Sequence, residues 1–320
     1  MRFRTIVLAA ALSVAAAQGH AAGLKFLEVP ADASGPALEA AQWSPCAAPA
    51  EETKVGAFVF RAVPDCPIAG GKRPLVVISH GFGGSYVGHH DLAEVLADAG
   101  FIVVALNHPG DTTANTARAR NVSALIDRPT DVKRLIDYLL GASPDAPKID
   151  SNRIGFFGFS RGGYTGLVLG GANPDFNALR APCADPTGAT CAPRSPWPAH
   201  PLTHDPRIKA IVAADPLSSV FAAPDSVKAV TVSLQLWASA RGGDGVSPEA
   251  VATLVRNLPV KPEVHVVPNS GHFAFLIPCP PAAKAPPELC VDSPGFDRAA
   301  FHVELNQRIL AFLRLRLAAP

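Results

Sequence analysis

Short apolar runs alternate with amphipathic stretches through most of the chain. The continuous runs, rich in β-branched residues, are typical of strands buried on both faces. The predicted strands are Pro74–Ser79, Phe101–Leu106, Ile154–Phe159, Ile208–Ala213, Val230–Leu236 and Glu263–Val267. Apolar residues at helical spacing predict helices over Asp91–Asp98, Asp131–Leu140, Gly162–Leu169, Pro248–Leu258 and Phe301–Leu317. This alternation predicts an α/β fold, with a mostly parallel sheet covered by helices on both faces.

Two parts of the chain depart from this alternation. Residues 23–61 contain three short extended segments, Leu24–Val29, Ala37–Trp43 and Val55–Phe60, which Pro and Gly separate. Residues 173–206 carry several prolines, two cysteines and little periodicity, and they predict an inserted loop or small cap. Neither part adds a second core or a repeat. We therefore expect residues 23–320 to form a single domain.

The first 22 residues have the organisation of a secretory signal peptide. Arg2 and Arg4 precede an apolar run over Ile6–Ala17, and small residues follow through Ala21 and Ala22. This run is too short to cross the ~30 Å hydrocarbon core of a bilayer, which takes about 20 residues. We expect cleavage after Ala21 or Ala22, a periplasmic or secreted protein, and no membrane span.

Composition and charge narrow the possible partners. The chain has 320 residues, of which 48% are hydrophobic, and this is enough to bury a large core. Its net charge is +1, and loss of residues 1–22 takes away two arginines and no acidic residue, which brings the charge to about −1. A near-neutral chain argues against nucleic acid as a main partner and against a basic membrane-binding surface.

The six cysteines all lie after the predicted signal peptide. In an oxidising compartment an even count indicates disulfides. No CxxC is present and no cysteine has a histidine at ligand spacing, so a metal site is not indicated. Six cysteines allow 15 pairings. Proximity in the sequence favours Cys46–Cys66, Cys183–Cys191 and Cys279–Cys290.

A serine lies between two glycines where a predicted strand runs into a predicted helix. The residues Gly158-Phe159-Ser160-Arg161-Gly162 fit the pattern G-x-S-x-G. This short pattern also occurs in ordinary turns, but the strand–turn–helix context is the one that a nucleophile elbow requires. Side chains at the glycine positions would collide in so sharp a turn. Ser160 is therefore the candidate nucleophile, and the Arg161 N–H is a candidate donor to a developing oxyanion.

A second glycine-rich loop follows the first predicted strand of the alternating region. It reads His80-Gly81-Phe82-Gly83-Gly84, and it resembles the HG-x-G loop that supplies a second oxyanion N–H. We assign that donor to Phe82. A phosphate-binding role is not indicated, because neither G-x-G-x-x-G nor GK[ST] is present.

A serine nucleophile needs a base, and His272 is the strongest of ten histidines. It follows the last predicted strand, in agreement with the order Ser, acid, His. His265 lies within a predicted strand and is interpreted as structural, and His108 as a loop residue that shapes the site. His89 and His90 lack the acidic or cysteine neighbours of a metal site.

Two aspartates are candidates for the acid that orients His272. Asp244 lies in a glycine-rich loop after the predicted strand Val230–Leu236, and Asp215 ends the strand before it. Either strand end could present a carboxylate to the histidine. We favour Asp244, because its loop leaves the carboxylate free to reach, whereas Asp215 precedes Pro216 and suits a turn cap.

Together these motifs resemble the α/β-hydrolases, and more narrowly the secreted bacterial predicted dienelactone hydrolases, a group related to platelet-activating-factor acetylhydrolase-like enzymes. The resemblance covers most of the mature chain and rests on HGFGG, NHPGDT, RPTDV (128–132) before a helix, GFSRGGYTGL, GGDGVSP and SGHFAFL. It implies Ser160 as nucleophile, His272 as base, Asp244 as acid, and Phe82 and Arg161 as oxyanion donors. Dienelactone hydrolase proper has a cysteine nucleophile, so the serine here argues against a dienelactone substrate. The acetylhydrolase branch places the acid after the earlier strand, which keeps Asp215 open.

We therefore expect a secreted, monomeric serine hydrolase that cleaves carboxylic esters through an acyl-enzyme on Ser160, without a metal or cofactor. The expected partner is a small-molecule or lipid ester. One alternative is a phospholipase A2-like acetylhydrolase acting on lipid esters. An alternative of another class is a non-catalytic binding protein on a hydrolase scaffold.

Overall fold

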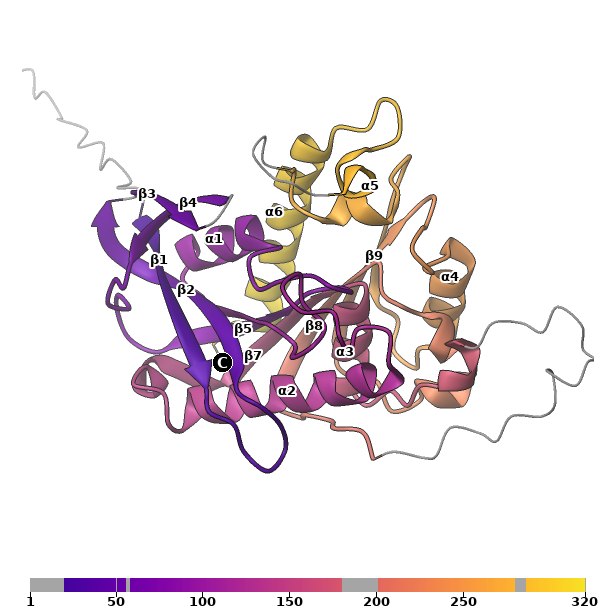
Figure 1. The fold of residues 1–320 in the computed structure, drawn as a ribbon, viewed down its shortest axis with the longest axis horizontal. Coiled ribbons are helices and arrows are strands. Elements are labelled where there is room, and N and C mark those ends of the chain that lie inside the picture. Colours follow the sequence, from indigo (N-terminus) through magenta and orange to yellow (C-terminus); the bar gives the residue numbers. More distant parts are fainter. Residues whose placement is uncertain (1–19, 50, 56–57, 180–200, 280–285, 320) are drawn as a thin grey trace, which may run out of the picture.

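The computed structural model describes residues 20–49, 51–55, 58–179, 201–279 and 286–319 (Figure 1). The predicted signal peptide, up to residue 19, and the predicted pair Cys183–Cys191 lie outside these residues. Within the described ranges, no helix is long and apolar enough to cross a membrane.

Ten strands of the described chain form one sheet, in the order β10-β9-β8-β7-β5-β6-β2-β1-β4-β3. The six strands from β10 to β6 in this order pair in parallel. They are β5 (Arg73–Ser79), β6 (Ile102–Leu106), β7 (Ile149–Phe159), β8 (Ile208–Ala214), β9 (Ser233–Ser239) and β10 (Glu263–Val267). This block confirms the predicted, mostly parallel sheet, although β9 begins later than expected.

The N-terminal strands extend the sheet beyond β6. β1 (His20–Val29) and β2 (Leu38–Pro49) form an antiparallel pair, and β2 runs antiparallel to β6. β3 (Glu52–Val55) and β4 (Phe58–Pro64) are also antiparallel, and their register pairs the last residue of β3 with the first residue of β4. The single segment predicted over Val55–Phe60 is therefore wrong, because it spans the junction of two strands.

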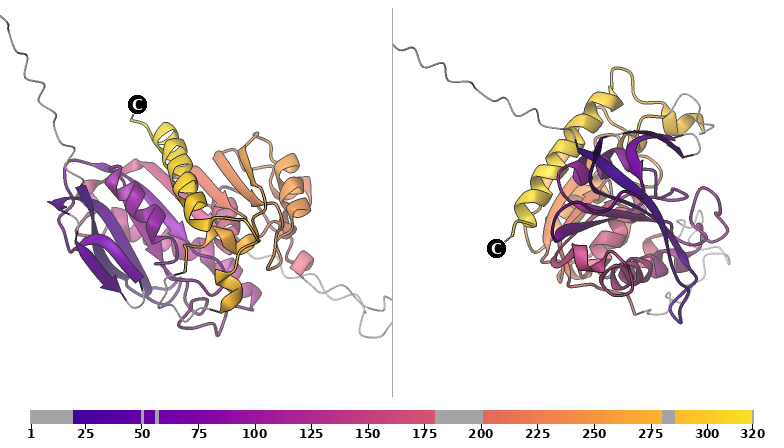
Figure 2. Two further views of the ribbon diagram at one scale, coloured as in Figure 1. Left: turned by 90° about the horizontal axis from the view of Figure 1, so that it is seen from above. Right: turned by 90° about the vertical axis from the view of Figure 1, so that its left-hand side faces the viewer.

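Helices cover both faces of the sheet, as predicted (Figures 1 and 2). On one face, α1 (His90–Asp98) and α6 (Arg298–Arg316) share an apolar core with alternate strand residues such as Val76 and Ile78. On the other face, α2 (Val122–Leu140), α3 (Arg161–Leu169) and α4 (Pro248–Asn257) pack on Leu75, Val77 and their equivalents. The shorter helices are η1 (Ala146–Lys148), η2 (Phe176–Leu179), η4 (Ser219–Phe221), η5 (Pro224–Ser226), η6 (His272–Phe275) and α5 (Pro287–Cys290).

The helix α2 begins nine residues before the predicted start at Asp131. The predicted start lies after Pro129, and proline lacks an N–H and disfavours a helical residue before it. In the structure Pro129 lies inside the helix. Leu125 and Val132 are buried in the core on either side of it. Tertiary packing therefore outweighs the local cost of the proline.

Two of the predicted disulfides are formed. Cys46 of β2 is joined to Cys66, just after β4, with the Cα atoms 5.9 Å apart. Cys279 is joined to Cys290 of α5, with a Cα separation of 5.6 Å. Both bonds lie outside the parallel strands, and each joins a loop or edge segment to its neighbour.

Candidate active site

The loops at the carboxyl ends of the parallel strands carry the candidate residues. The glycine-rich loop follows β5, Ser160 follows β7, Asp215 follows β8 and His272 follows β10. In parallel α/β sheets this edge is where ligands bind. The topology thus brings together residues from separate parts of the chain.

Ser160 occupies a strained turn between β7 and α3. Its φ is +55°, a conformation that non-glycine residues seldom adopt. A Cβ on Gly162 would lie 1.9 Å from the carbonyl oxygen of Ser79, and one on Gly158 would lie 2.1 Å from that of Gly162. These clashes are the steric reason predicted for the two glycines. The Ser160 N–H donates to the Ala214 carbonyl of β8 at 2.9 Å, which helps to hold the turn.

His272 lies at the start of η6 with its ring buried. The ring stacks on Phe159, the residue before Ser160, with a centroid separation of 4.7 Å. Its Nδ1 lies 2.6 Å from Oδ2 of Asp215. Its Nε2 is buried and has no hydrogen-bond partner among the described residues. The histidine is therefore oriented on one side and unpaired on the other.

Asp215 accepts hydrogen bonds from three donors. Oδ1 accepts the Ser239 N–H, and Oδ2 accepts the Ser239 hydroxyl, both at 2.8 Å. The third donor is Nδ1–H of His272, a tautomer that follows because an ionised carboxylate can only accept. Asp215 is buried at the end of β8 and has φ +43°. Its conformation and its donors aim the carboxylate at the imidazole.

Asp244, the acid favoured from the sequence, does not contact His272. It is exposed in the turn between Gly243 and Val246, with φ +47°. The glycines before it bring backbone to the histidine instead, because the His272 N–H donates to the Gly242 carbonyl at 2.9 Å. A Cβ on Gly243 would lie 3.3 Å from the His272 Cβ. The structure thus differs from the favoured assignment and brings Asp215, the alternative, to the histidine.

The loop after β5 lies against Ser160. A Cβ on Gly81 would be 3.2 Å from the Ser160 Cβ, so a side chain there would crowd the serine. Among the described residues, neither the Phe82 N–H nor the Arg161 N–H has an acceptor. Arg161 also begins α3, where the first backbone N–H groups are unpaired. Two free N–H donors therefore come from the loops that flank the serine.

A second Ser–His–Asp group lies next to this loop, and its serine, Ser79, directly precedes the loop in the sequence. Ser79 Oγ is 2.8 Å from His108 Nε2, and His108 Nδ1 is 3.0 Å from Asp131 Oδ2. All three side chains are buried. Burial raises the pKa of Asp131 to about 7 and lowers that of His108 well below its usual range. The sequence interpretation of His108 as a loop residue missed this arrangement.

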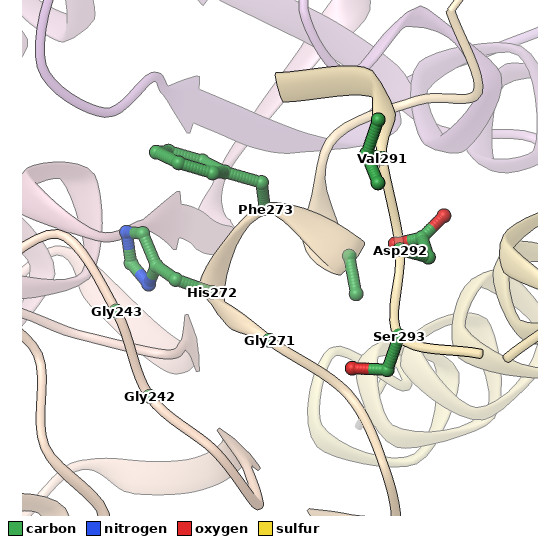
Figure 3. Close-up of a pocket in the computed structure, with 9 residues that line it drawn as sticks. Gly242, Gly243, Gly271, His272, Phe273, Val291, Asp292 and Ser293 are labelled. Carbon is green, nitrogen blue, oxygen red and sulfur yellow. The ribbon is translucent and has the colours of Figure 1, made fainter. Parts of the chain in front are cut away.

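A small pocket of about 150 Å³ opens beside His272 (Figure 3). One wall is formed by Gly242, Gly243 and the segment Gly271–Ala274, and the other by Val291–Ser293. In Figure 3 the His272 ring points away from the Val291–Ser293 wall. The second wall directly follows α5 in the sequence.

The other histidines singled out from the sequence are held by protein groups. His89 is buried edge-on against Phe157 and Phe159, and this burial lowers its pKa to about 4. His90 Nδ1 lies 3.0 Å from Glu94, and the His265 ring stacks on Trp237. In the part of the chain that the structure describes, no three His, Cys, Asp or Glu side chains gather as metal ligands do.

Comparisons with known proteins agree on the fold. A family model described as serine aminopeptidase, S33, matches residues 70–223, a range that contains Ser160 and Asp215. The chain is similar to a solved ferulic acid esterase from Streptomyces cinnamoneus, with a TM-score of 0.66 and 20% identity over 96% of this chain and 95% of that one. No curated protein gives a significant match. With the observed sheet order and helix layers, these likenesses show that the chain has the α/β-hydrolase fold.

Proposed function

We propose that this protein is a secreted serine hydrolase that cleaves carboxylic esters through an acyl-enzyme on Ser160. The observation that carries the proposal is the φ of +55° at Ser160, between a buried strand and a helix. Folding does not favour such strain by itself, and strained residues of this kind cluster at active sites. The neighbouring His272–Asp215 pair supplies the base that a serine hydroxyl needs.

In this mechanism Ser160 Oγ attacks the ester carbonyl carbon, and its proton passes to His272 Nε2. Asp215 holds the imidazole in the correct tautomer and stabilises the imidazolium that forms. The carbonyl oxygen becomes an oxyanion that accepts the Phe82 and Arg161 N–H groups. The C–O bond then breaks, and the alcohol leaves with the proton from His272. Water then attacks the acyl-enzyme while His272 Nε2 takes its proton. The bond to Ser160 Oγ breaks, Oγ regains the proton from His272, and the carboxylic acid is released.

The unpaired nitrogen of His272 supports this assignment. Nε2 is buried, and a buried ring nitrogen without a partner costs stability. In a serine hydrolase the nucleophile hydroxyl takes this position, and such bonds often tighten only when substrate binds. The free nitrogen and the free N–H groups of Phe82 and Arg161 are the three sites that the reaction would fill.

Ester cleavage is favoured over amide cleavage by the extent of the structural likeness. The ferulic acid esterase superposes over nearly all of both chains. The aminopeptidase model matches residues 70–223 only, and it makes peptide hydrolysis the second candidate. The alternative activity, that of a phospholipase A2-like acetylhydrolase on lipid esters, is also ester cleavage.

Secretion rests on the predicted signal peptide and on the two disulfides, which persist in oxidising compartments. Ala22 is buried in β1, where it pairs with Pro45 of β2 on one side and with Ala62 of β4 on the other. Cleavage after Ala21 would keep the Ala22 contact, and we therefore propose that position over Ala22.

The test compares the wild-type chain with Ser160→Ala on p-nitrophenyl acetate and butyrate and on an amino-acid p-nitroanilide. We expect ester turnover by the wild type, and a kcat about 10⁴–10⁶-fold lower for the variant, with an unchanged circular dichroism spectrum. Turnover of the anilide alone would favour the peptidase. No turnover of either class by the folded wild type would favour a binding protein.

A further inference from the structure

Arg128 is buried within α2 and is used by no step of the proposed mechanism. Its Nε and Nη2 donate to Asp111 Oδ2 at 3.1 and 2.9 Å. Its Nη1 donates to the His80 carbonyl at 2.7 Å, and its Nη2 donates to the Gly81 carbonyl at 3.0 Å. A buried arginine that binds consecutive carbonyls of one loop holds the orientation of that loop.

The Gly81 carbonyl and the Phe82 N–H belong to one peptide group. In a trans peptide the carbonyl and the N–H point in opposite directions. Because the Gly81 carbonyl points at the Arg128 guanidinium, the Phe82 N–H points away from it. The loop lies against Ser160, since a Cβ on Gly81 would be 3.2 Å from the Ser160 Cβ. Arg128 thus sets the direction of the proposed oxyanion donor.

His80 holds the same carbonyl from another side. Its Nε2 accepts the His108 N–H at 3.3 Å, so its proton is on Nδ1, which lies 2.7 Å from the Gly81 oxygen. Burial lowers the pKa of His80 to about 3, so the imidazole stays neutral at ordinary pH. The Gly84 N–H also donates to this carbonyl, at 3.4 Å, so three donors fix the plane of the Gly81–Phe82 peptide.

Asp111 extends this clamp to the far end of the loop. Its Oδ1 accepts the Gly83 N–H at 2.8 Å, while its Oδ2 binds Arg128. The side chain of Arg161, whose backbone supplies the second proposed donor, also approaches Oδ2 at 3.4 Å. The peptide of Phe82 is thus held between an anchored carbonyl before it and an anchored N–H after it.

We infer that Arg128 is a positioning residue of the oxyanion hole, which acts by aiming the Phe82 N–H through the Gly81 carbonyl. This inference rests on the proposed function, because it assigns a role within the same site. Arg128 touches no reacting atom. Its loss should therefore weaken binding of the transition state and leave binding of the ground state largely unchanged.

The chain offers a matched control on the same helix. Arg134 is also buried in α2, and it binds Asp32 at 2.9 Å and the carbonyls of Pro36 and Pro30 at 2.8 and 3.0 Å. These partners lie in the loop between β1 and β2, which contributes nothing to the proposed site. Arg134→Lys therefore reproduces the structural cost of replacing a buried arginine that binds one aspartate and two carbonyls.

The experiment measures kcat and KM for p-nitrophenyl acetate, and Ki for a trifluoromethyl ketone that forms a tetrahedral adduct with serine. For Arg128→Lys we expect kcat to fall by about 10²-fold with KM within ~3-fold, comparable to loss of one oxyanion donor. Ki should rise by the same factor as kcat/KM falls. For Arg134→Lys all three constants should stay within ~3-fold.

Two outcomes would overturn the inference. One is Arg128→Lys with a kcat no lower than that of Arg134→Lys. The other is a raised KM at unchanged kcat, which would make Arg128 a binding residue. Should Arg128→Lys not fold, Asp111→Asn is measured by the same criteria, since it weakens the clamp from the other side. Failure of the proposed function is distinct, because the wild type itself would then show neither turnover nor inhibition.

Discussion

The described part of the chain contains two Ser–His–Asp groups, and only one has the features that we propose for an active site. Ser160, His272 and Asp215 lie at the ends of three parallel strands. The other group, Ser79–His108–Asp131, has both histidine nitrogens within hydrogen-bond distance of their partners, at 2.8 and 3.0 Å. By hydrogen-bond pattern alone, the second group is the more complete triad.

The difference lies in what each group leaves free. In the first group His272 Nε2 is unpaired and Ser160 is strained. In the second, Arg128 Nη1 approaches the Ser79 hydroxyl at 3.4 Å, so this serine has a partner besides His108. A satisfied triad rigidifies the fold, whereas a nucleophile needs a base whose nitrogen is free to take its proton, and free N–H donors nearby. The hydrogen-bonding groups that each triad leaves free therefore indicate which one can catalyse.

Replacement of the two histidines should separate the groups most strongly. We expect His272→Ala to lower kcat about 10⁴–10⁶-fold in a protein that still folds. His108→Ala should lower kcat by less than about 10-fold but destabilise the fold by about 1–3 kcal/mol, because it leaves buried partners unpaired. Ester kinetics and thermal melts check both. Equal kcat losses for the two variants would contradict the distinction.

The two aspartates that compete as the acid give the next largest effect. Asp215→Asn should lower kcat by about 10⁴-fold, since an amide favours the wrong histidine tautomer. Asp244→Asn should leave kcat within ~3-fold, because the side chain is exposed and makes no contact with His272. The kinetics are measured on folded variants of equal concentration. Loss of turnover in Asp244→Asn alone would restore the assignment favoured from the sequence.

Asp131 should make stability depend on pH in a direction opposite to that of an ion-paired aspartate. Burial raises its pKa to about 7, above the ~3.9 of an exposed aspartate, so folding favours the protonated form. This contribution is fully present below about pH 4 and is lost as the pH rises through 7. The Tm of Asp131→Asn relative to wild type should therefore increase from pH 5 to pH 8. A constant or falling difference would refute it.

Removal of the Ser79 hydroxyl should have the smallest effect. Ser79→Ala leaves His108 Nε2 without its partner, at a cost of about 1 kcal/mol, and kcat should change by less than ~3-fold. The same substitution at Ser160 abolishes turnover on the present account. Chemical denaturation and ester kinetics of Ser79→Ala measure the two quantities. A large kcat loss at wild-type stability would mean that Ser79 takes part in the reaction.

The sequence was sufficient where local geometry decides the structure. The glycines around Ser160 are needed because their Cβ atoms would meet backbone within about 2 Å, and this clash is encoded within five residues. The parallel strands were also predicted, since burial on both faces requires continuous apolar runs. His272 was found from its place after the last strand.

The sequence was insufficient where distant segments meet. The loop after β9 could bring either its backbone or the Asp244 carboxylate to His272, and its glycines allow either arrangement. In the structure the backbone of this loop reaches His272, and the carboxylate comes from Asp215. Arg128 was noted in the RPTDV motif but was given no role, because its partners lie in the loop after β5 and at Asp111, far from it in sequence. The predicted helix also began at Asp131, after Pro129, and so did not include Arg128. The signal that could have been pursued is the arginine of the RPTDV motif.

The residue that a fluorophosphonate labels identifies the nucleophile most directly. The wild-type protein is treated with the probe, digested and analysed by mass spectrometry. We predict a single adduct on Ser160, abolished in Ser160→Ala and retained in Ser79→Ala. Labelling of Ser79, or an undiminished adduct in folded Ser160→Ala, would contradict the assignment of the nucleophile.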